Sequence, residues 1–152
     1  MKALTQNEIQ QQIPHRFENL LIDKIKTHET GHASLELLIK EEDPQNRTLF
    51  FKQKYQSEKT LIPLISMEIL ALTSICATGQ LEPNQVVLFA SISNFKLFHD
   101  IPINTLLTGK VSPKKTKPPF YYYNCELTIN NTIVASGLLS AFFSKEALEN
   151  KK

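Results

Sequence analysis

The sequence predicts an α+β protein in which an antiparallel sheet of about six strands curls around one long buried helix. Three observations lead to this class. Residues 61–79 form one long apolar stretch with helical punctuation, short stretches of alternating apolar residues stand on both sides of it, and polar turns join those stretches. At 152 residues, the chain suits a single domain spanning 1–152 with one core.

The helix is expected over residues 61–79. Pro63 fits only within a first turn, and Gly79 stands where a left-handed residue would end the helix. Apolar residues cover nearly its whole circumference, and Glu68 is its only formal charge. An isolated carboxylate in apolar surroundings costs several kcal/mol unless it is paired, hydrogen-bonded or neutralised. Glu68 is therefore the first candidate for a catalytic or substrate-orienting group; the alternative is an acid satisfied by neighbouring amides or by a partner subunit.

The N-terminal part predicts a short helix followed by a hairpin. Thr5 with Glu8 three residues later is a capping-box pattern, so residues 1–12 should contain that helix. A strand is expected to start in residues 20–25, with a turn at 31–32 and a second strand over 33–42. The polar connection 43–60 carries Phe50, Phe51 and Tyr55, and connections of this length are usually functional or mobile.

Four more strands are expected after the helix. They occupy residues 86–98, 105–111, 120–129 and 132–143, and Asn130–Asn131 suits a tight hairpin turn. The stretch SPKKTKPP at 112–119 predicts a basic, proline-rich loop, because proline cannot donate to a sheet ladder. Residues 145–152 read as a frayed charged tail. Alternation along 120–129 predicts five core-facing side chains: Tyr121, Tyr123, Cys125, Leu127 and Ile129.

Composition argues against several classes of function. The chain has 17 basic and 15 acidic residues, so its net charge of +2 gives no global attraction to nucleic acid. Neither a secretory leader nor a membrane-spanning apolar run is expected, and the cytoplasm is the expected compartment. Cys76 and Cys125 lack CxxC or histidine spacing, so buried free thiols are expected rather than a disulfide or metal site, and no cofactor or metal is expected.

Two segments resemble a known family. Residues 13–25, IPHRFENLLIDKI, resemble the stretch LPHRYPFLLVDRV of the β-hydroxyacyl-acyl-carrier-protein dehydratases of fatty-acid synthesis, and residues 68–72 resemble their EAMAQ run. The resemblance covers roughly residues 6–144. It implies the hotdog fold and a homodimer whose sheets pair edge to edge, with acyl tunnels at the interface. It also implies an acid/base role for Glu68, the residue already singled out by its charge.

The chain departs from that family at three places. The glutamine of EAMAQ is Leu72, and a glycine after the helix-starting proline is Leu64. The loop GHFPGHP, which supplies the family's catalytic histidine, is replaced by KQKYQSEKTLIP, and the histidine position falls near Lys54 or Tyr55. Dehydration needs a base for the C2 proton and an acid for the departing hydroxyl. The expected activity is therefore divergent or absent, with Tyr55 either a weak acid or a loop aromatic that covers the core.

Three functional hypotheses follow. The first is a 3-hydroxyacyl-acyl-carrier-protein dehydratase-like protein that binds an acyl thioester on acyl carrier protein or coenzyme A. The others are a non-catalytic hotdog subunit whose partner supplies the histidine, and an acyl thioesterase. The expected catalytic residues are Glu68 and Tyr55, and the expected substrate-binding residues are Phe50, Phe51, Leu64, Ile65 and Leu72.

Other polar residues have weaker functional interpretations. Lys110, Lys114, Lys115 and Lys117 could steer an acidic carrier protein, although a solvated turn is the simpler interpretation. A nucleic-acid platform would need exposed rings beside a broader positive field, so no nucleic-acid partner is expected. The remaining candidates are expected to be structural or solvated: His15, Arg16, His28, His32 and His99, with a His99–Glu68 pair as the alternative for the last.

Overall fold

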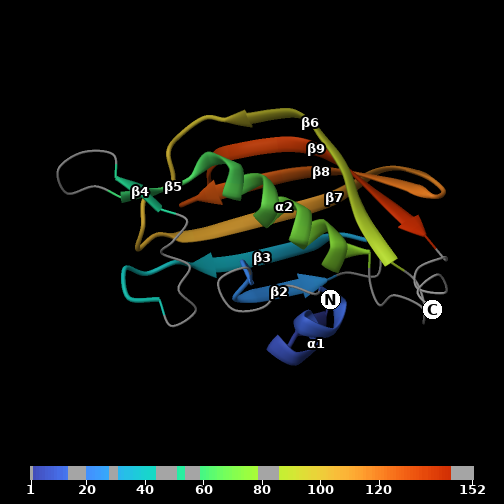
Figure 1. The fold of residues 1–152 in the computed structure, drawn as a ribbon, viewed down its shortest axis with the longest axis horizontal. Helices are drawn as coiled ribbons and strands as arrows, with labels where there is room; N and C mark the ends of the chain where they lie inside the picture. The colour runs from blue at the N-terminus through green and yellow to red at the C-terminus, as the bar shows by residue number, and fades with distance from the viewer. Residues whose placement is uncertain are drawn as a thin grey trace, which may run out of the picture.

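The computed structural model describes residues 2–13, 20–27, 31–43, 51–53, 59–78 and 86–144. In this part of the chain, a seven-stranded antiparallel sheet has the order β1-β2-β3-β7-β8-β9-β6. The helix α2 lies across one face of the sheet (Figure 1). The strands of this sheet are β1 Lys2–Leu4, β2 Lys24–Thr27, β3 Ala33–Leu38, β6 Val86–Leu97, β7 Leu106–Lys117, β8 Phe120–Ile129 and β9 Thr132–Ser144.

This arrangement confirms the predicted class, an antiparallel sheet with one central helix. Among the described strands, β1 and β6 form the two edges of the sheet and do not pair to close it into a barrel. The main sheet has seven strands where about six were expected, because β1 was not predicted, and the connection before α2 contains a separate hairpin of β4 (Phe51–Gln53) and β5 (Lys59–Leu61). A three-residue strand is too short to show alternation, which is why the sequence did not reveal them.

Helix α2 spans Pro63–Ala77, within the predicted range 61–79. Pro63 is the first residue of the helix. Proline suits this position because an N–H there would have no hydrogen-bond partner within the helix. Thr78 is the C-cap, and Gly79 lies outside the described residues. Four apolar side chains of the helix are almost completely shielded from solvent and belong to the core: Ile69, Leu70, Leu72 and Cys76.

The face of the sheet that meets α2, here called the inner face, is apolar. On β8 the side chains of Tyr123, Cys125 and Leu127 are buried, while Asn124 and Glu126 between them are exposed. Strand β3 repeats this pattern with Leu35 and Leu37 in the core. The predicted alternation is confirmed, because successive side chains of a strand point to opposite faces.

The predicted loop at 112–119 is wrong. Strand β7 continues to Lys117, β8 begins at Phe120, and Pro118–Pro119 makes the turn between them. Pro113 is accommodated next to an irregularity in the β7–β8 pairing between Pro113 and Lys115. A β-bulge interrupts the regular ladder, so the missing N–H of a nearby proline is tolerated there.

The beginning of the predicted hairpin also needs correction. Leu20, Leu21 and Ile22 are buried but precede the strand, and β2 starts only at Lys24. The helix α1 (Gln6–Gln12) forms as predicted: the Glu8 N–H donates to the Thr5 hydroxyl at 3.3 Å, and the Thr5 N–H donates to the Glu8 carboxylate at 2.8 Å. Hydrophobic residues 20–22 therefore serve packing rather than the sheet ladder.

Candidate functional site

Glu68 lies on the second turn of α2, at a boundary between solvent and core. Leu64, Glu68 and Leu72 are spaced by four residues and so share one side of the helix. Along that side, exposure falls from 67% at Leu64 through half-buried Glu68 to 1% at Leu72. The carboxylate is thus reachable from outside while its neighbours toward the helix C-terminus are enclosed.

No side chain of the N-cap residue caps the N-terminus of α2. Its N-cap residue, Ile62, provides no side-chain hydrogen bond to the first turn. Backbone N–H groups at a helix N-terminus carry partial positive charge and can polarise a carbonyl oxygen. In this turn Pro63 has no N–H and the Ile65 N–H donates to the Ile62 carbonyl at 2.9 Å, which leaves the Leu64 N–H as the candidate donor. The hydroxyls of Thr60 and Ser66, close in sequence to this end, are buried and have no hydrogen-bond partner among the described residues. The N-terminal end of α2 therefore has two unsatisfied hydroxyls close to it in sequence and Glu68 one turn further along.

The structure places the predicted substrate-binding residues in different environments. Leu64 and half-buried Ile65 lie beside Glu68 on the first turns of α2, whereas Leu72 is part of the core. Phe51 is half-buried on β4, directly opposite Leu61 of β5, and packs against the core. Six residues that the sequence singled out lie outside the described part of the chain: His15, Arg16, His28, Phe50, Lys54 and Tyr55.

The four candidate docking lysines are not near the N-terminus of α2. Register places Lys110, Lys115 and Lys117 opposite Glu126, Tyr122 and Phe120, on the face turned away from α2, here called the outer face. An ideal Cβ on Gly31 would be 3.9 Å from both the Ala77 oxygen and the Pro113 Cγ, so this part of β7 lies near the C-terminal end of α2. The lysines and Glu68 thus occupy different faces.

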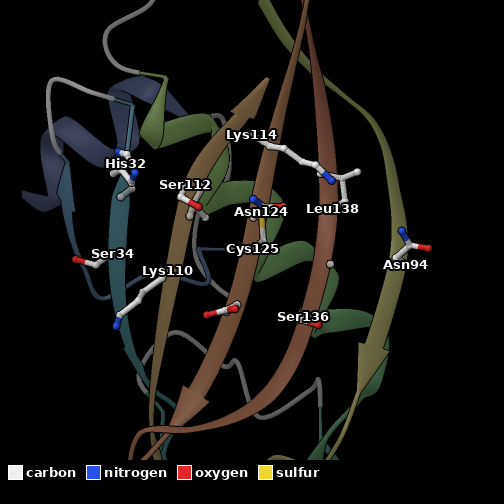
Figure 2. A pocket seen from close by; sticks show the side chains of 14 residues that line it. His32, Ser34, Asn94, Lys110, Ser112, Lys114, Asn124, Cys125, Ser136 and Leu138 are labelled. Carbon is white, nitrogen blue, oxygen red and sulfur yellow. The ribbon is translucent and has the colours of Figure 1, made fainter. Parts of the chain in front are cut away.

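A groove of about 740 Å³ crosses the outer face (Figure 2). Lys110 and Lys114 line it together with polar residues that the sequence analysis did not select, among them Asn94, Ser112, Asn124 and Ser136. Alternation along each strand could have marked these as solvent-facing positions. Their assembly into one groove depends on the pairing of strands far apart in the chain, which no local pattern reports.

The two cysteines are buried free thiols, as predicted. Burial raises the pKa of Cys76 to about 12 and that of Cys125 to about 12. A thiol held protonated at neutral pH is a poor nucleophile, so neither cysteine suits a catalytic role. The described residues contain no cluster of histidine, cysteine and carboxylate groups that could hold a metal ion. They also contain no helix long and apolar enough to cross a membrane.

Comparison with known proteins connects this architecture to a family. No family model matches the chain. The chain is 28% identical over 132 residues to the 3-hydroxyacyl-[acyl-carrier-protein] dehydratase FabZ of Staphylococcus aureus, which covers 86% of this chain and 88% of the relative. This similarity, together with the antiparallel sheet and its central helix, supports kinship with the hotdog-fold dehydratases. The similarity spans the sheet and α2, so it concerns the whole fold.

Solved structures show the same fold at low sequence identity. The HP0420 homologue from Helicobacter felis superposes with a TM-score of 0.70 at 14% identity, over 94% of this chain and 92% of that one. A chain of the dehydratase heterocomplex ApeI:P from Xenorhabdus doucetiae gives 0.69 at 10% identity, over 88% and 89%. The thioesterase HI1161 from Haemophilus influenzae gives 0.68 at 14% identity, over 99% and 97%. The hotdog fold thus serves dehydratases and thioesterases among these neighbours.

Proposed function

We propose that this hotdog protein binds an acyl thioester at the N-terminal half of α2, as a 3-hydroxyacyl-acyl-carrier-protein dehydratase-like protein. The observation that carries the proposal is the position of Glu68, half-buried between exposed Leu64 and core residue Leu72. A thioester carbonyl at this helix end would be polarised by the helix dipole and the Leu64 N–H, while Glu68 reaches the carbon next to it. The acyl carrier protein is the proposed carrier, with coenzyme A as the alternative.

The proposed assembly is a homodimer formed through a sheet edge. Strand β6 pairs with β9 on one side, and no described strand pairs with its other side. Its 12 residues present unpaired backbone groups and the exposed apolar side chains Leu88 and Phe89. A free edge of this length and character favours pairing with another strand. A second copy paired there would also cover apolar surface.

Dehydration with Glu68 but without the family's catalytic histidine would lack one member of the usual acid–base pair. The family's histidine loop is replaced here by a segment without histidine, residues 52–63. Loss of one member of an acid–base pair lowers rates on the order of 10²–10⁴-fold. The proposed activity is therefore a slow or altered dehydration that depends on Glu68, with Tyr55 as the residue proposed to act with it.

A second candidate function is a non-catalytic subunit that binds the acyl chain while another hotdog chain supplies the histidine. Two observations favour it: the missing histidine, and the structural similarity to a chain of a dehydratase heterocomplex. Thioester hydrolysis is a third candidate, favoured by the fold shared with thioesterase HI1161 and by the presence of one carboxylate at a helix N-terminus.

Turnover assays with purified protein separate these functions. The protein is incubated with 3-hydroxyacyl thioesters and with saturated acyl thioesters. Loss of water identifies a dehydratase, release of free thiol identifies a thioesterase, and saturable binding without either product identifies the subunit role. In an active protein, Glu68→Gln should lower kcat on the order of 10²-fold or more, whereas the matched control Glu126→Gln on the outer face should leave it unchanged. Unchanged turnover in Glu68→Gln would refute a Glu68-dependent enzyme.

The lysines of β7 are candidates for binding the carrier protein rather than the acyl group. We retain the proposal that Lys110, Lys114, Lys115 and Lys117 attract an acidic carrier protein through charge complementarity. All four lysines lie away from Glu68, so reversing their charge leaves the acid/base group in place. Charge reversal of Lys115 and Lys117, on the outer face, therefore tests carrier docking directly. That variant should weaken carrier association and flatten its salt dependence; an unchanged affinity would exclude docking at these lysines.

A further inference from the structure

The groove on the outer face is built from five strands. Figure 2 shows Ser34 of β3, Lys110 and Ser112 of β7, Asn124 of β8, Ser136 of β9 and Asn94 of β6 around it. Its volume of about 740 Å³ falls within the range of small-molecule sites, roughly 300–1,000 Å³. Hydroxyl, amide and charged groups therefore converge in a space large enough for a metabolite.

Strand register aligns part of this lining across the sheet. Ser34 pairs with Lys110, Lys110 with Glu126, and Glu126 with Ser136. Directly opposite residues of neighbouring strands share a face, with Cβ atoms roughly 4.5–5.5 Å apart. These four side chains form one polar row across β3, β7, β8 and β9. Their relative positions are held by the ladder rather than by a loop.

Two irregularities in the ladder add a side chain at each flank of the row. The β7–β8 register shifts between Pro113 and Lys115, which leaves Lys114 as the extra residue. The β6–β9 register shifts between Ser93 and Lys96, and Asn94 in that stretch has φ 53°. Both Lys114 and Asn94 line the groove. Bulges re-aim side chains and occur often beside functional sites, so their convergence on one groove is a second sign of a built site.

The charge of the groove selects the class of ligand. Neither Lys110 nor Lys114 has an ion-pair partner among the described residues, and Glu126 is the only carboxylate in the lining. In Figure 2 the two lysine side chains extend in different directions, with Ser112 and Asn124 between them. Lysine binds phosphate as a point charge, while hydroxyl and amide groups both donate to and accept from ligand hydroxyls. The lining suits an anionic ligand with a polar body.

We propose that the outer groove binds a small phosphorylated, hydroxyl-rich metabolite, of the nucleotide or sugar-phosphate class. This site goes beyond the proposed acyl-thioester function, because it lies on the face of the sheet opposite α2 and Glu68. A nucleic-acid polymer fits less well: the rings of Phe120 and Phe142 pack on each other at 5.2 Å and do not line the groove. Stacking platforms need such rings free for bases.

Binding is measured by NMR titration of the ¹⁵N-labelled full chain. The probes are ADP, ribose 5-phosphate, adenosine, inorganic phosphate and a single-stranded oligothymidylate. We expect saturable binding of ADP, ribose 5-phosphate or both, with shifts at Lys110 and Asn124 and none along α2. Binding of ADP alone identifies the nucleotide class, and binding of ribose 5-phosphate alone identifies the sugar-phosphate class.

Variants localise the binding. Lys110→Gln with Lys114→Gln should raise Kd at least tenfold, whereas Lys117→Gln, on the same strand and face but outside the groove, should change it less than twofold. Ser136→Phe, which fills the groove without removing a charge, should abolish binding, and a native-like spectrum checks folding. Glu68→Gln should still bind, which separates this site from the acyl site.

Several results would overturn the proposal. They are failure of both phosphorylated probes to bind, adenosine binding as tightly as ADP, and inorganic phosphate binding as tightly as either, which would indicate an adventitious ion only. Binding of the oligothymidylate alone would show a polymer surface instead. Equal weakening by Lys117→Gln would reduce the effect to the general charge of the face.

Discussion

The inner and outer faces of one sheet differ in nearly every physical property. On β8, Leu127 is fully buried against the core while its neighbour Glu126 is exposed in the outer groove. The inner face meets the helix, which carries a half-buried carboxylate, and two thiols are buried on that side; the outer face carries lysines and hydroxyls that reach solvent. One backbone thus supports two faces of opposite character, because a strand alternates its side chains between faces.

The two faces also differ in what they can recognise. The inner face is apolar and packed against α2, with Glu68 placed where solvent meets core. The outer groove is open to solvent and suits an anion, since Lys110 and Lys114 have no ion-pair partners within the described residues. The proposed acyl chain and the proposed anion would occupy opposite faces, so binding at Glu68 and binding in the outer groove are tested with different variants.

The largest contrast should appear in thiol reactivity. Cys76 and Cys125 both lie on the helix side of the sheet, and burial raises each pKa from 9.0 to about 12. In the folded protein at pH 8, both thiols should react with a disulfide reagent on the order of a hundredfold more slowly than in the unfolded protein, or more slowly still. Absorbance of the released thiolate measures this. Fast labelling of the native protein would show that water enters the inner face.

The same thiols predict an alkaline loss of stability. Their folded pKa lies above the unfolded value of 9.0, so their contribution to stability is intact below pH 9 and declines as the pH rises toward 12. Replacement of Cys125 by alanine should therefore make the free energy of unfolding less dependent on pH in that window. Urea unfolding at pH 8 and pH 10.5 provides the comparison.

Neighbouring residues on β8 give the sharpest test of the two faces. Leu127→Ala should destabilise the protein by about 2–5 kcal/mol, because it removes buried atoms and leaves a cavity between sheet and helix. Glu126→Ala, one residue away on the outer face, should change stability by no more than about 0.5 kcal/mol. Urea unfolding followed by circular dichroism measures both. Similar losses in the two variants would contradict the division into a packed and a solvated face.

The smallest effect is expected outside both faces, at the N-terminal edge. Thr5→Ala removes the hydroxyl that accepts the Glu8 N–H and should cost about 1 kcal/mol. A hydrogen bond from Lys2 lowers the pKa of Glu8 from 4.5 to about 2, helped by bonds from Thr5. Stabilisation by the ionised Glu8 is thus full above pH 4.5 and lost toward pH 2. The melting temperatures of wild type and Glu8→Gln should converge over that range; a constant gap would contradict it.

The sequence by itself determined the class of the fold and the position of its helix. Pro63, the apolar circumference of α2 and the Thr5–Glu8 box are local signals, and they were right because propensity and capping act within a few residues. Local signals failed where pairing overrode them. The prolines near Lys114 predicted a loop, but a bulge at Pro113 let β7 continue and the Pro118–Pro119 pair became a hairpin turn.

Tertiary structure alone decided how the candidate residues group into sites. Glu68 was found by charge on an apolar helix, but its half-buried place between Leu64 and Leu72 depends on how α2 lies on the sheet. The lysines were noticed as a run, yet their face, their distance from Glu68 and the groove they share with Asn94 follow from strand register. Register joins segments far apart in the chain, and no local pattern of residues specifies which strand lies beside which.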